Sequence, residues 1–171
     1  MPLHSDRALF ELLCLEGAQA GLSWWTILRK RRGYRRAFAR FNIKKVASFK
    51  ARSVETLVKN PEIVRHKLKI QSVISNARAI LKIQREFGSL DAFLWQFVAN
   101  KPIQSRLKRT SGVNTRSRES DAMSAALRSA GLSFVGTTIC YAFMQAAGLV
   151  NDHSPYCFRW REVRALALLR T

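Results

Sequence analysis

The chain has 171 residues, of which 47% are apolar and 24% charged, both near the averages of globular proteins. No apolar run approaches the ~20 residues of a membrane span, the first residues do not have the pattern expected of a signal peptide, and three cysteines argue against a disulfide framework. Thirty Lys and Arg stand against eleven Asp and Glu, a net charge of +19 that favours a polyanionic partner, nucleic acid before an anionic membrane surface. We therefore expect a cytoplasmic protein with one domain over residues 1–171 and no membrane partner.

The first half of the chain has helical periodicity. A first helix is expected over residues 6–16 with Ser5 as its cap, and a second over 24–41 with Ser23 as its cap. A short helix fits residues 53–59. Asn60 and Pro61 then indicate the start of another helix, because proline loses no needed hydrogen bond at the first helical position.

The second half continues in helices. They are expected over residues 70–87, where Gly88 ends the pattern, and over 89–98, 120–131 and 134–150. Gly136 suggests a close backbone approach in the last of these. Residues 104–120 are basic and lack periodicity, which predicts a loop, and residues 158–171 form a tail of unknown role. No convincing strand is present, so we expect an all-α fold.

A basic segment lies between two helical patterns. It contains Arg65, His66, Lys67 and Lys69. A short turn that opens a new helix can offer cations and backbone N–H groups to phosphates, which would hold DNA without reading its sequence. Taken alone, the segment is about as compatible with a solvated basic turn.

Glu16 and the adjacent tryptophans Trp24 and Trp25 flank a glycine-rich break. A carboxylate there could accept hydrogen bonds from the amino group of a base, whereas the alternative is a helix-end acid that pairs with an arginine. One tryptophan could serve the core and the other could line a pocket and stack on an unstacked base.

His153 and Cys157 lie four residues apart, and both residue types suit zinc. Cys14 and Cys140 lie in apolar runs and are expected to be buried thiols. From spacing alone, a chance pair is favoured over a zinc site. The sequence contains no phosphate-binding or dinucleotide-binding loop, so no nucleotide cofactor is expected.

Three segments together are more specific: "LFELLCLEGAQAGLSWWTIL", "IVRHKLKIQSVISNARAIL" and "FVGTTICYAFMQAAGLVNDH". They resemble, in this order, the DNA-3-methyladenine glycosylase I family, a branch of the helix-hairpin-helix DNA glycosylases, from about Pro2 to Cys157. The resemblance implies two helical lobes with a lesion pocket between them, and a monomer that acts on double-stranded alkylated DNA. The implied reaction is base-excision repair by hydrolysis of the N-glycosidic bond of 3-methyladenine after base flipping, with no lyase step.

The resemblance also implies roles for individual residues. Glu16 would be the catalytic, base-binding carboxylate and Trp24 would line the base pocket. Gly21 and Leu22 would lie on the loop that presses into the duplex. The DNA-gripping hairpin would contain Arg65, Lys67 and Lys69.

In this family a structural zinc is bound by a histidine and a cysteine that match His153 and Cys157. The other two ligands lie in an N-terminal segment that precedes the start of this chain, and His4 does not match either. With two of four ligands we expect zinc to bind weakly, if at all. The alternative to an active enzyme is a truncated, inactive helical DNA-binding protein that keeps the hairpin without a complete pocket.

Overall fold

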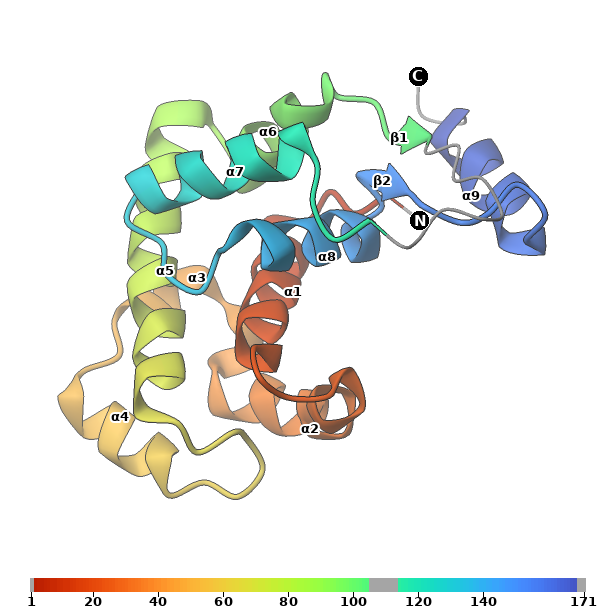
Figure 1. Cartoon of the computed structure of the whole chain (residues 1–171). Coiled ribbons are helices and arrows are strands. Elements are labelled where there is room, and N and C mark those ends of the chain that lie inside the picture. Colours follow the sequence, from red (N-terminus) through yellow and green to blue (C-terminus); the bar gives the residue numbers. More distant parts are fainter. Residues whose placement is uncertain (1, 105–113, 169–171) are drawn as a thin grey trace.

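A computed structural model of the chain describes residues 2–104 and 114–168 and is mainly helical, as predicted (Figure 1). The elements, in chain order, are α1 (Asp6–Gln19), α2 (Trp24–Ala37), η1 (Ala39–Phe41), α3 (Ile43–Ala47), α4 (Ala51–Val58), α5 (Lys67–Phe87), α6 (Leu90–Trp95), η2 (Gln96–Val98), β1 (Ile103–Gln104), α7 (Arg118–Ser129), α8 (Thr137–Ala147), β2 (Val150–Asn151) and α9 (Phe158–Leu168).

Two helices join the two lobes of the fold. α1 packs against α2 and η1 on one side and against α6 and α8 on the other. α5 contacts α3 and α4 in one lobe and α6 in the other, and it runs along one side of the molecule in Figure 1. Both helices are rich in buried apolar residues, so one continuous core passes through both lobes.

The start of α1 is fixed differently from the prediction. Ser5 occupies the N-cap position, but its side chain makes no capping hydrogen bond. The neighbouring Asp6 instead accepts hydrogen bonds from the backbone N–H groups of Leu90 and Asp91, both at 2.9 Å. The carboxylate therefore ties the beginning of α1 to the positive end of α6.

Several boundaries differ from the prediction, and two of the differences in the first lobe have a clear local cause. The second helix ends at Ala37 rather than at residue 41, because Ala39, Arg40 and Phe41 have left-handed φ angles of 49° to 55°. The helix predicted to start at Pro61 is wrong. Asn60 Oδ1 accepts a hydrogen bond from the Glu62 N–H at 2.9 Å, which stabilises a turn instead.

The prediction of a loop over 104–120 is partly wrong. Residues 105–113 lie outside the described part of the chain, but Ser117 caps α7, so residues 118–120 are helical. Ile103 and Gln104 pair in parallel with Val150 and Asn151, a two-residue ladder too short to show a sequence period.

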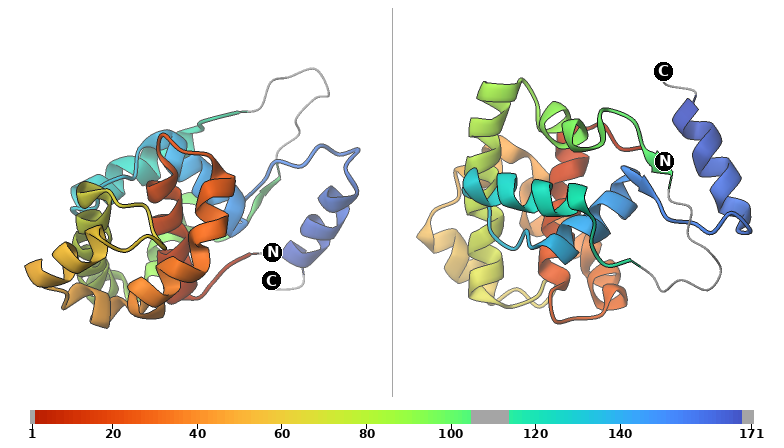
Figure 2. Two further views of the ribbon diagram at one scale, coloured as in Figure 1. Left: turned by 90° about the horizontal axis from the view of Figure 1, so that it is seen from below. Right: turned by 45° about the horizontal axis from the view of Figure 1, so that its top comes forward.

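The tail contains α9, which lies at the edge of the molecule in both views of Figure 2. α9 contacts β2, and Val163 is buried. The Trp160 carbonyl oxygen accepts a hydrogen bond from Asn151 Nδ2 at 3.3 Å. These contacts attach the tail to β2.

The close backbone approaches lie at other glycines than Gly136. A Cβ on Gly136 would meet only a flexible arginine side chain, Arg128, at 3.5 Å. A Cβ on Gly33 would lie 2.3 Å from the Glu62 carbonyl oxygen, and one on Gly17 would lie 3.1 Å from that of Phe134. Glycine at these two positions lets α2 reach the connection between α4 and α5, and lets α1 reach the segment before α8.

Candidate nucleic-acid interface and base-binding site

Glu16 lies near the end of α1 and is only 5% exposed. In the described part of the chain, no hydrogen bond or ion pair reaches its carboxylate, so none of the described arginines pairs with it. Burial raises the pKa of Glu16 to about 7. A buried carboxylate without a partner is costly for the protein, and it can stabilise a hydrogen-bond donor or a positive charge brought by a ligand.

A tight turn follows α1 and contains Gly21 and Leu22. The Leu22 N–H donates to the Gln19 carbonyl oxygen at 2.7 Å, and Gln19 Nε2 donates to the Leu22 carbonyl oxygen at 2.8 Å. Ala20 has φ −46° and ψ 118°, and Gly21 has φ 74°, which are the angles of a type II turn. The turn presents the Leu22 side chain, 37% exposed, to solvent, as a wedge residue requires.

The two tryptophans after this turn have different environments. Ser23 caps α2 by accepting a hydrogen bond from the Thr26 N–H at 3.2 Å, as predicted. Trp24 is half-buried and packs against the core, whereas Trp25 is 68% exposed. One of the two tryptophans packs against the core, as predicted, whereas base stacking by either stays a prediction. Trp24 lies on the same short segment as Glu16, and its role in binding a base stays a prediction.

The basic side chains at the connection between α4 and α5 differ in their exposure to solvent. Arg65 and Lys67 are exposed, and His66 Nδ1 accepts a hydrogen bond from the Lys69 N–H, so the histidine caps α5. Lys69 is buried, in disagreement with the prediction that it contacts DNA. Its Nζ donates to the carbonyl oxygens of Ala18 at 2.9 Å and Ala20 at 2.5 Å.

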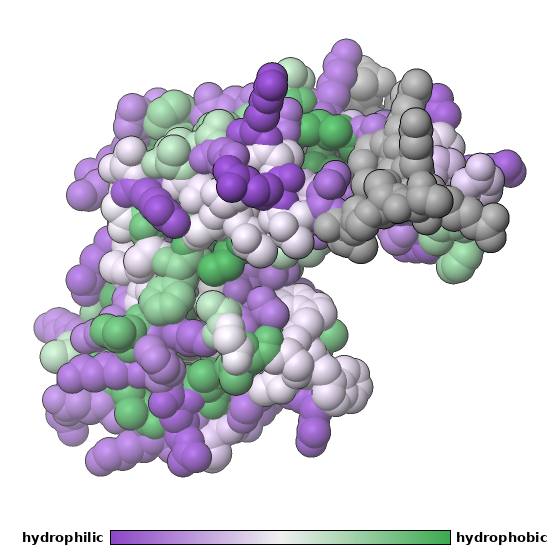
Figure 3. Space-filling view, in the orientation of Figure 1, coloured by the Kyte–Doolittle hydropathy of each residue, from purple (hydrophilic) through white to green (hydrophobic). Residues whose placement is uncertain are grey.

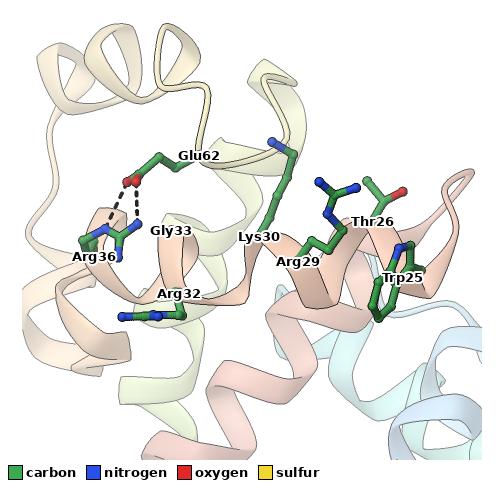
Figure 4. A pocket seen from close by; sticks show the side chains of 8 residues that line it. All are labelled: Trp25, Thr26, Arg29, Lys30, Arg32, Gly33, Arg36 and Glu62. Carbon is green, nitrogen blue, oxygen red and sulfur yellow. Dashed lines mark hydrogen bonds and ion pairs between the residues drawn. The ribbon is translucent and has the colours of Figure 1, made fainter.

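α2 carries most of the positive charge near this connection. Buried Glu11 accepts hydrogen bonds from Arg31 at 2.6 Å and Arg35 at 2.8 Å, which neutralises part of it. A hollow of about 560 Å³ lies between α2 and the connection (Figure 4). It is lined by Trp25, Thr26, Arg29, Lys30, Arg32, Gly33, Arg36 and Glu62. In Figure 4, Arg36 pairs with Glu62 at one end while Trp25 and Arg29 lie toward the other. The net charge of the lining suits a phosphate backbone.

The molecular surface is largely hydrophilic on the face shown in Figure 3. In Figure 3, hydrophilic residues cover much of the visible face, with apolar residues in scattered patches among them. The face is indented between the part formed by α1 and α2 and the part that carries α9.

His153 and Cys157 come together in the loop after β2. The His153 Nδ1 and Cys157 Sγ atoms are 3.8 Å apart, near the roughly 3.5 Å expected for two ligands of one tetrahedral zinc. Among the described residues, however, no group of three or more His, Cys, Asp or Glu side chains could hold a metal ion. Cys14 and Cys140 are buried free thiols, as predicted. The residues present therefore fit half of a zinc site.

Sequence reasoning missed the roles of Gln19 and Lys69 in building the turn after α1. The "QAGL" stretch, with glycine third, could have indicated a type II turn. Nothing in the sequence shows that Lys69 reaches that turn, because the two segments meet only in the folded chain. Within the described ranges, no helix is long and apolar enough to cross a membrane.

Comparisons with known proteins identify the family of the chain. The family model for methyladenine glycosylase matches residues 1–160. DNA-3-methyladenine glycosylase 1 of Escherichia coli K12 is 47% identical over 157 residues, which cover 92% of this chain and 84% of that protein.

Two solved structures extend the likeness to the fold. A crystal structure of 3-methyladenine DNA glycosylase I has a TM-score of 0.89 at 47% identity and covers 92% of this chain and 87% of that one. The Staphylococcus aureus enzyme, solved to show how it recognises 3-methyladenine, has a TM-score of 0.89 at 37% identity, with 92% and 84% covered. The chain therefore belongs to the methyladenine glycosylase family.

Proposed function

We propose that this chain removes 3-methyladenine from alkylated double-stranded DNA by hydrolysis of the N-glycosidic bond. Family membership supports the reaction class, and the relatives named above carry this activity in their names. The buried carboxylate of Glu16, which pairs with no described residue, is the observation in this chain that supports it most strongly.

The chemistry requires little acid catalysis. Methylation at N3 makes the base cationic in DNA, so its bond to the sugar is already weak. The base first leaves the stack, because the bond is inaccessible inside a duplex. Water then adds to the sugar carbon C1′ and loses a proton to solvent. The C1′–N9 electron pair departs with the base, which leaves an abasic site and no covalent enzyme intermediate.

Glu16 is suited to bind the cationic base. Its ionised form attracts the positive charge and accepts a hydrogen bond from the exocyclic amino group. Such interactions are stronger in a buried site than in water because less solvent screens them. An unmodified, neutral adenine gains less from the same carboxylate, which gives the site a preference for the lesion.

The DNA grip is assigned to exposed groups near this carboxylate. Leu22 would fill the gap left by the flipped base, as apolar wedges do in proteins that bend DNA. Arg65 and Lys67 would contact phosphates without reading sequence. The connection between α4 and α5 would then be the hairpin of a helix-hairpin-helix unit.

Zinc would be held by His153 and Cys157 if a further pair of ligands met them. When bound, the ion would fix the loop after β2, and it would supply no chemistry to the reaction. The described residues contribute two ligands, so we expect weak binding.

The test is release of base from duplex DNA treated with a methylating agent, with products separated by chromatography. We expect 3-methyladenine in the supernatant and abasic sites in the DNA. A chain that binds duplex in a salt-sensitive way, releases no base and shows no preference for lesions would instead be the inactive DNA-binding protein.

A further inference from the structure

We propose that Lys69 is a positioning residue that sets the wedge turn, residues 19–22, relative to the DNA-gripping connection, residues 59–66. This inference rests on the proposed function. It assigns Lys69 no contact with DNA or with the reacting base.

The first observation is the orientation of one peptide group. In a type II turn the central peptide carbonyl, here that of Ala20, points to a fixed side of the turn. Rotation of this peptide to another turn type would carry its oxygen away from Lys69 Nζ, which now lies 2.5 Å from it. The glycine at position 21 permits the φ angle of 74°, and Lys69 selects this peptide orientation among those that glycine permits.

The second observation is the place of the ammonium group at the end of α1. Lys69 Nζ also donates to the Ala18 carbonyl oxygen at 2.9 Å, one of the last carbonyls of the helix. Unpaired carbonyls carry the negative end of the helix dipole, so a cation stabilises them. Lys69 is only 9% exposed, which leaves its ammonium group turned to the protein rather than to a phosphate.

The third observation is the position of Lys69 in α5. Lys67 is the first residue of this helix, and Lys69 lies two residues later in the same capped turn. The backbone from Arg65 to Lys69 is held by His66, whose Nδ1 caps the Lys69 N–H at 3.3 Å. A phosphate held by Arg65 and Lys67 would therefore be linked to the turn of Leu22 through Lys69. In this proposal, the link sets how deep Leu22 enters the duplex once the backbone is gripped.

The central experiment compares Lys69→Met with Lys67→Met and Leu22→Ala. Lys69→Met keeps the length of the side chain and removes its donors. We expect single-turnover release of 3-methyladenine to fall about 10- to 100-fold, because a displacement of about 1 Å at a distance can have that effect. We expect the same loss in Leu22→Ala and no further loss in the double variant, since both changes remove one wedge. Lys69→Arg should recover part of the rate.

The salt dependence of duplex binding separates positioning from phosphate contact. Lys67→Met should lower the slope of log affinity against log salt by about 0.9, the value for one phosphate. Lys69→Met should leave that slope unchanged. A reduced slope in Lys69→Met, or a loss that adds fully to that of Leu22→Ala, would overturn the proposal.

Hydrogen exchange of the free protein gives a readout that does not depend on activity. The Leu22 amide is bonded within the turn, so its exchange should accelerate at least about 10-fold in Lys69→Met while buried α5 amides such as that of Ile80 keep their protection. Unchanged Leu22 exchange would contradict the proposal. If Lys69→Met does not fold, Gly21→Ala tests the same turn from its other side with Lys69 intact, and it should show the same loss of release without a change in salt slope.

Failure of the proposed function can be told apart from failure of this inference. If the unaltered chain releases no base, the proposed function fails. The Leu22 exchange rate and the salt slopes still decide whether Lys69 holds the turn.

Discussion

The turn after α1 and the loop after β2 differ in how many of the contacts that each site needs come from the described residues. Around the turn, Gln19, Gly21 and Lys69 fix the backbone, and Glu16 lies buried beside it on α1. In the loop, His153 and Cys157 meet at 3.8 Å, but no third ligand joins them among the described residues.

The difference shows that two residues of the right type can lie close together, as His153 and Cys157 do, without the further contacts that complete a site. In each region, the resemblance to the family assigns roles to particular residues. Lys69 of the distant helix α5 bonds the backbone of the turn region. Among the described residues, the side-chain bonds from other elements to the loop after β2 reach Asn151 and Asp152 rather than the side chains of the histidine and the cysteine. We therefore assign the reaction to the turn region and expect changes in the loop to have small effects.

The largest effect is expected from Glu16→Gln. Glutamine keeps the shape of the side chain but offers no negative charge to the cationic base. Removal of one such electrostatic interaction typically lowers a rate by about 10²–10³. Single-turnover release of 3-methyladenine should fall by this factor. A variant that retained wild-type release would assign the base-binding role to another group and weaken the contrast between the two regions.

The same substitution should stabilise the fold at high pH. Burial raises the pKa of Glu16 to about 7, so the folded chain holds this proton more tightly than the unfolded chain does. Stability contributed by the proton is complete below the ordinary glutamate pKa and is lost as the pH rises to about 7.

Glu16→Gln avoids that loss, so its advantage in the free energy of unfolding should grow from pH 4.5 to 7 and then level off. One pKa unit corresponds to about 1.4 kcal/mol, so a rise from 4.5 to about 7 limits the advantage to about 3.5 kcal/mol. Urea unfolding at several pH values measures it. A difference that does not vary with pH would show that the carboxylate has a solvated environment.

Gly33→Ala should lower the free energy of unfolding, because it disturbs the packing of α2 next to the turn region. Its Cβ would lie 2.3 Å from the Glu62 carbonyl oxygen, so α2 and the connection between α4 and α5 would have to separate. Overpacking of this kind costs about 1–3 kcal/mol, measured as a lower urea midpoint. Gly136→Ala is the matched control, because its Cβ meets only the end of the Arg128 side chain at 3.5 Å. Equal losses in the two variants would show that the close approach at Gly33 does not matter.

The smallest effect is expected in the loop after β2. The double variant His153→Ala with Cys157→Ala should change the free energy of unfolding by less than about 0.5 kcal/mol and base release by less than about twofold. Treatment of the unaltered chain with a chelator should change neither. A clear loss of stability with chelator would mean that a complete zinc site forms and that the two regions are equally supported.

Features set by neighbouring residues were predicted well from the sequence. The helical class, the cap at Ser23 and the helix ends at Gly88 and Gly131 follow from local patterns, and the structure confirms them. Cys14 and Cys140 were expected to be buried from their apolar surroundings, and they are.

Features set by distant contacts were predicted poorly. The helix expected at Pro61 is absent because Asn60 and Tyr34 bond the backbone in a turn, and Tyr34 lies on α2. Lys69 was assigned to DNA because its neighbours are basic, yet the carbonyls that bind it lie on α1. The spacing of His153 and Cys157 indicated a chance pair, and only the resemblance to a family suggested zinc.

The pH dependence of base release tests most directly the claim that ionised Glu16 binds the cationic base. The measurement is kcat/KM for 3-methyladenine release between pH 5 and 9, which reports the ionisation of the free enzyme. We expect it to rise with pH, to reach half its plateau near the Glu16 pKa of about 7, and to stay level above. A profile that is flat through pH 7, or one that Glu16→Gln shares in shape and height, would contradict the assignment of Glu16.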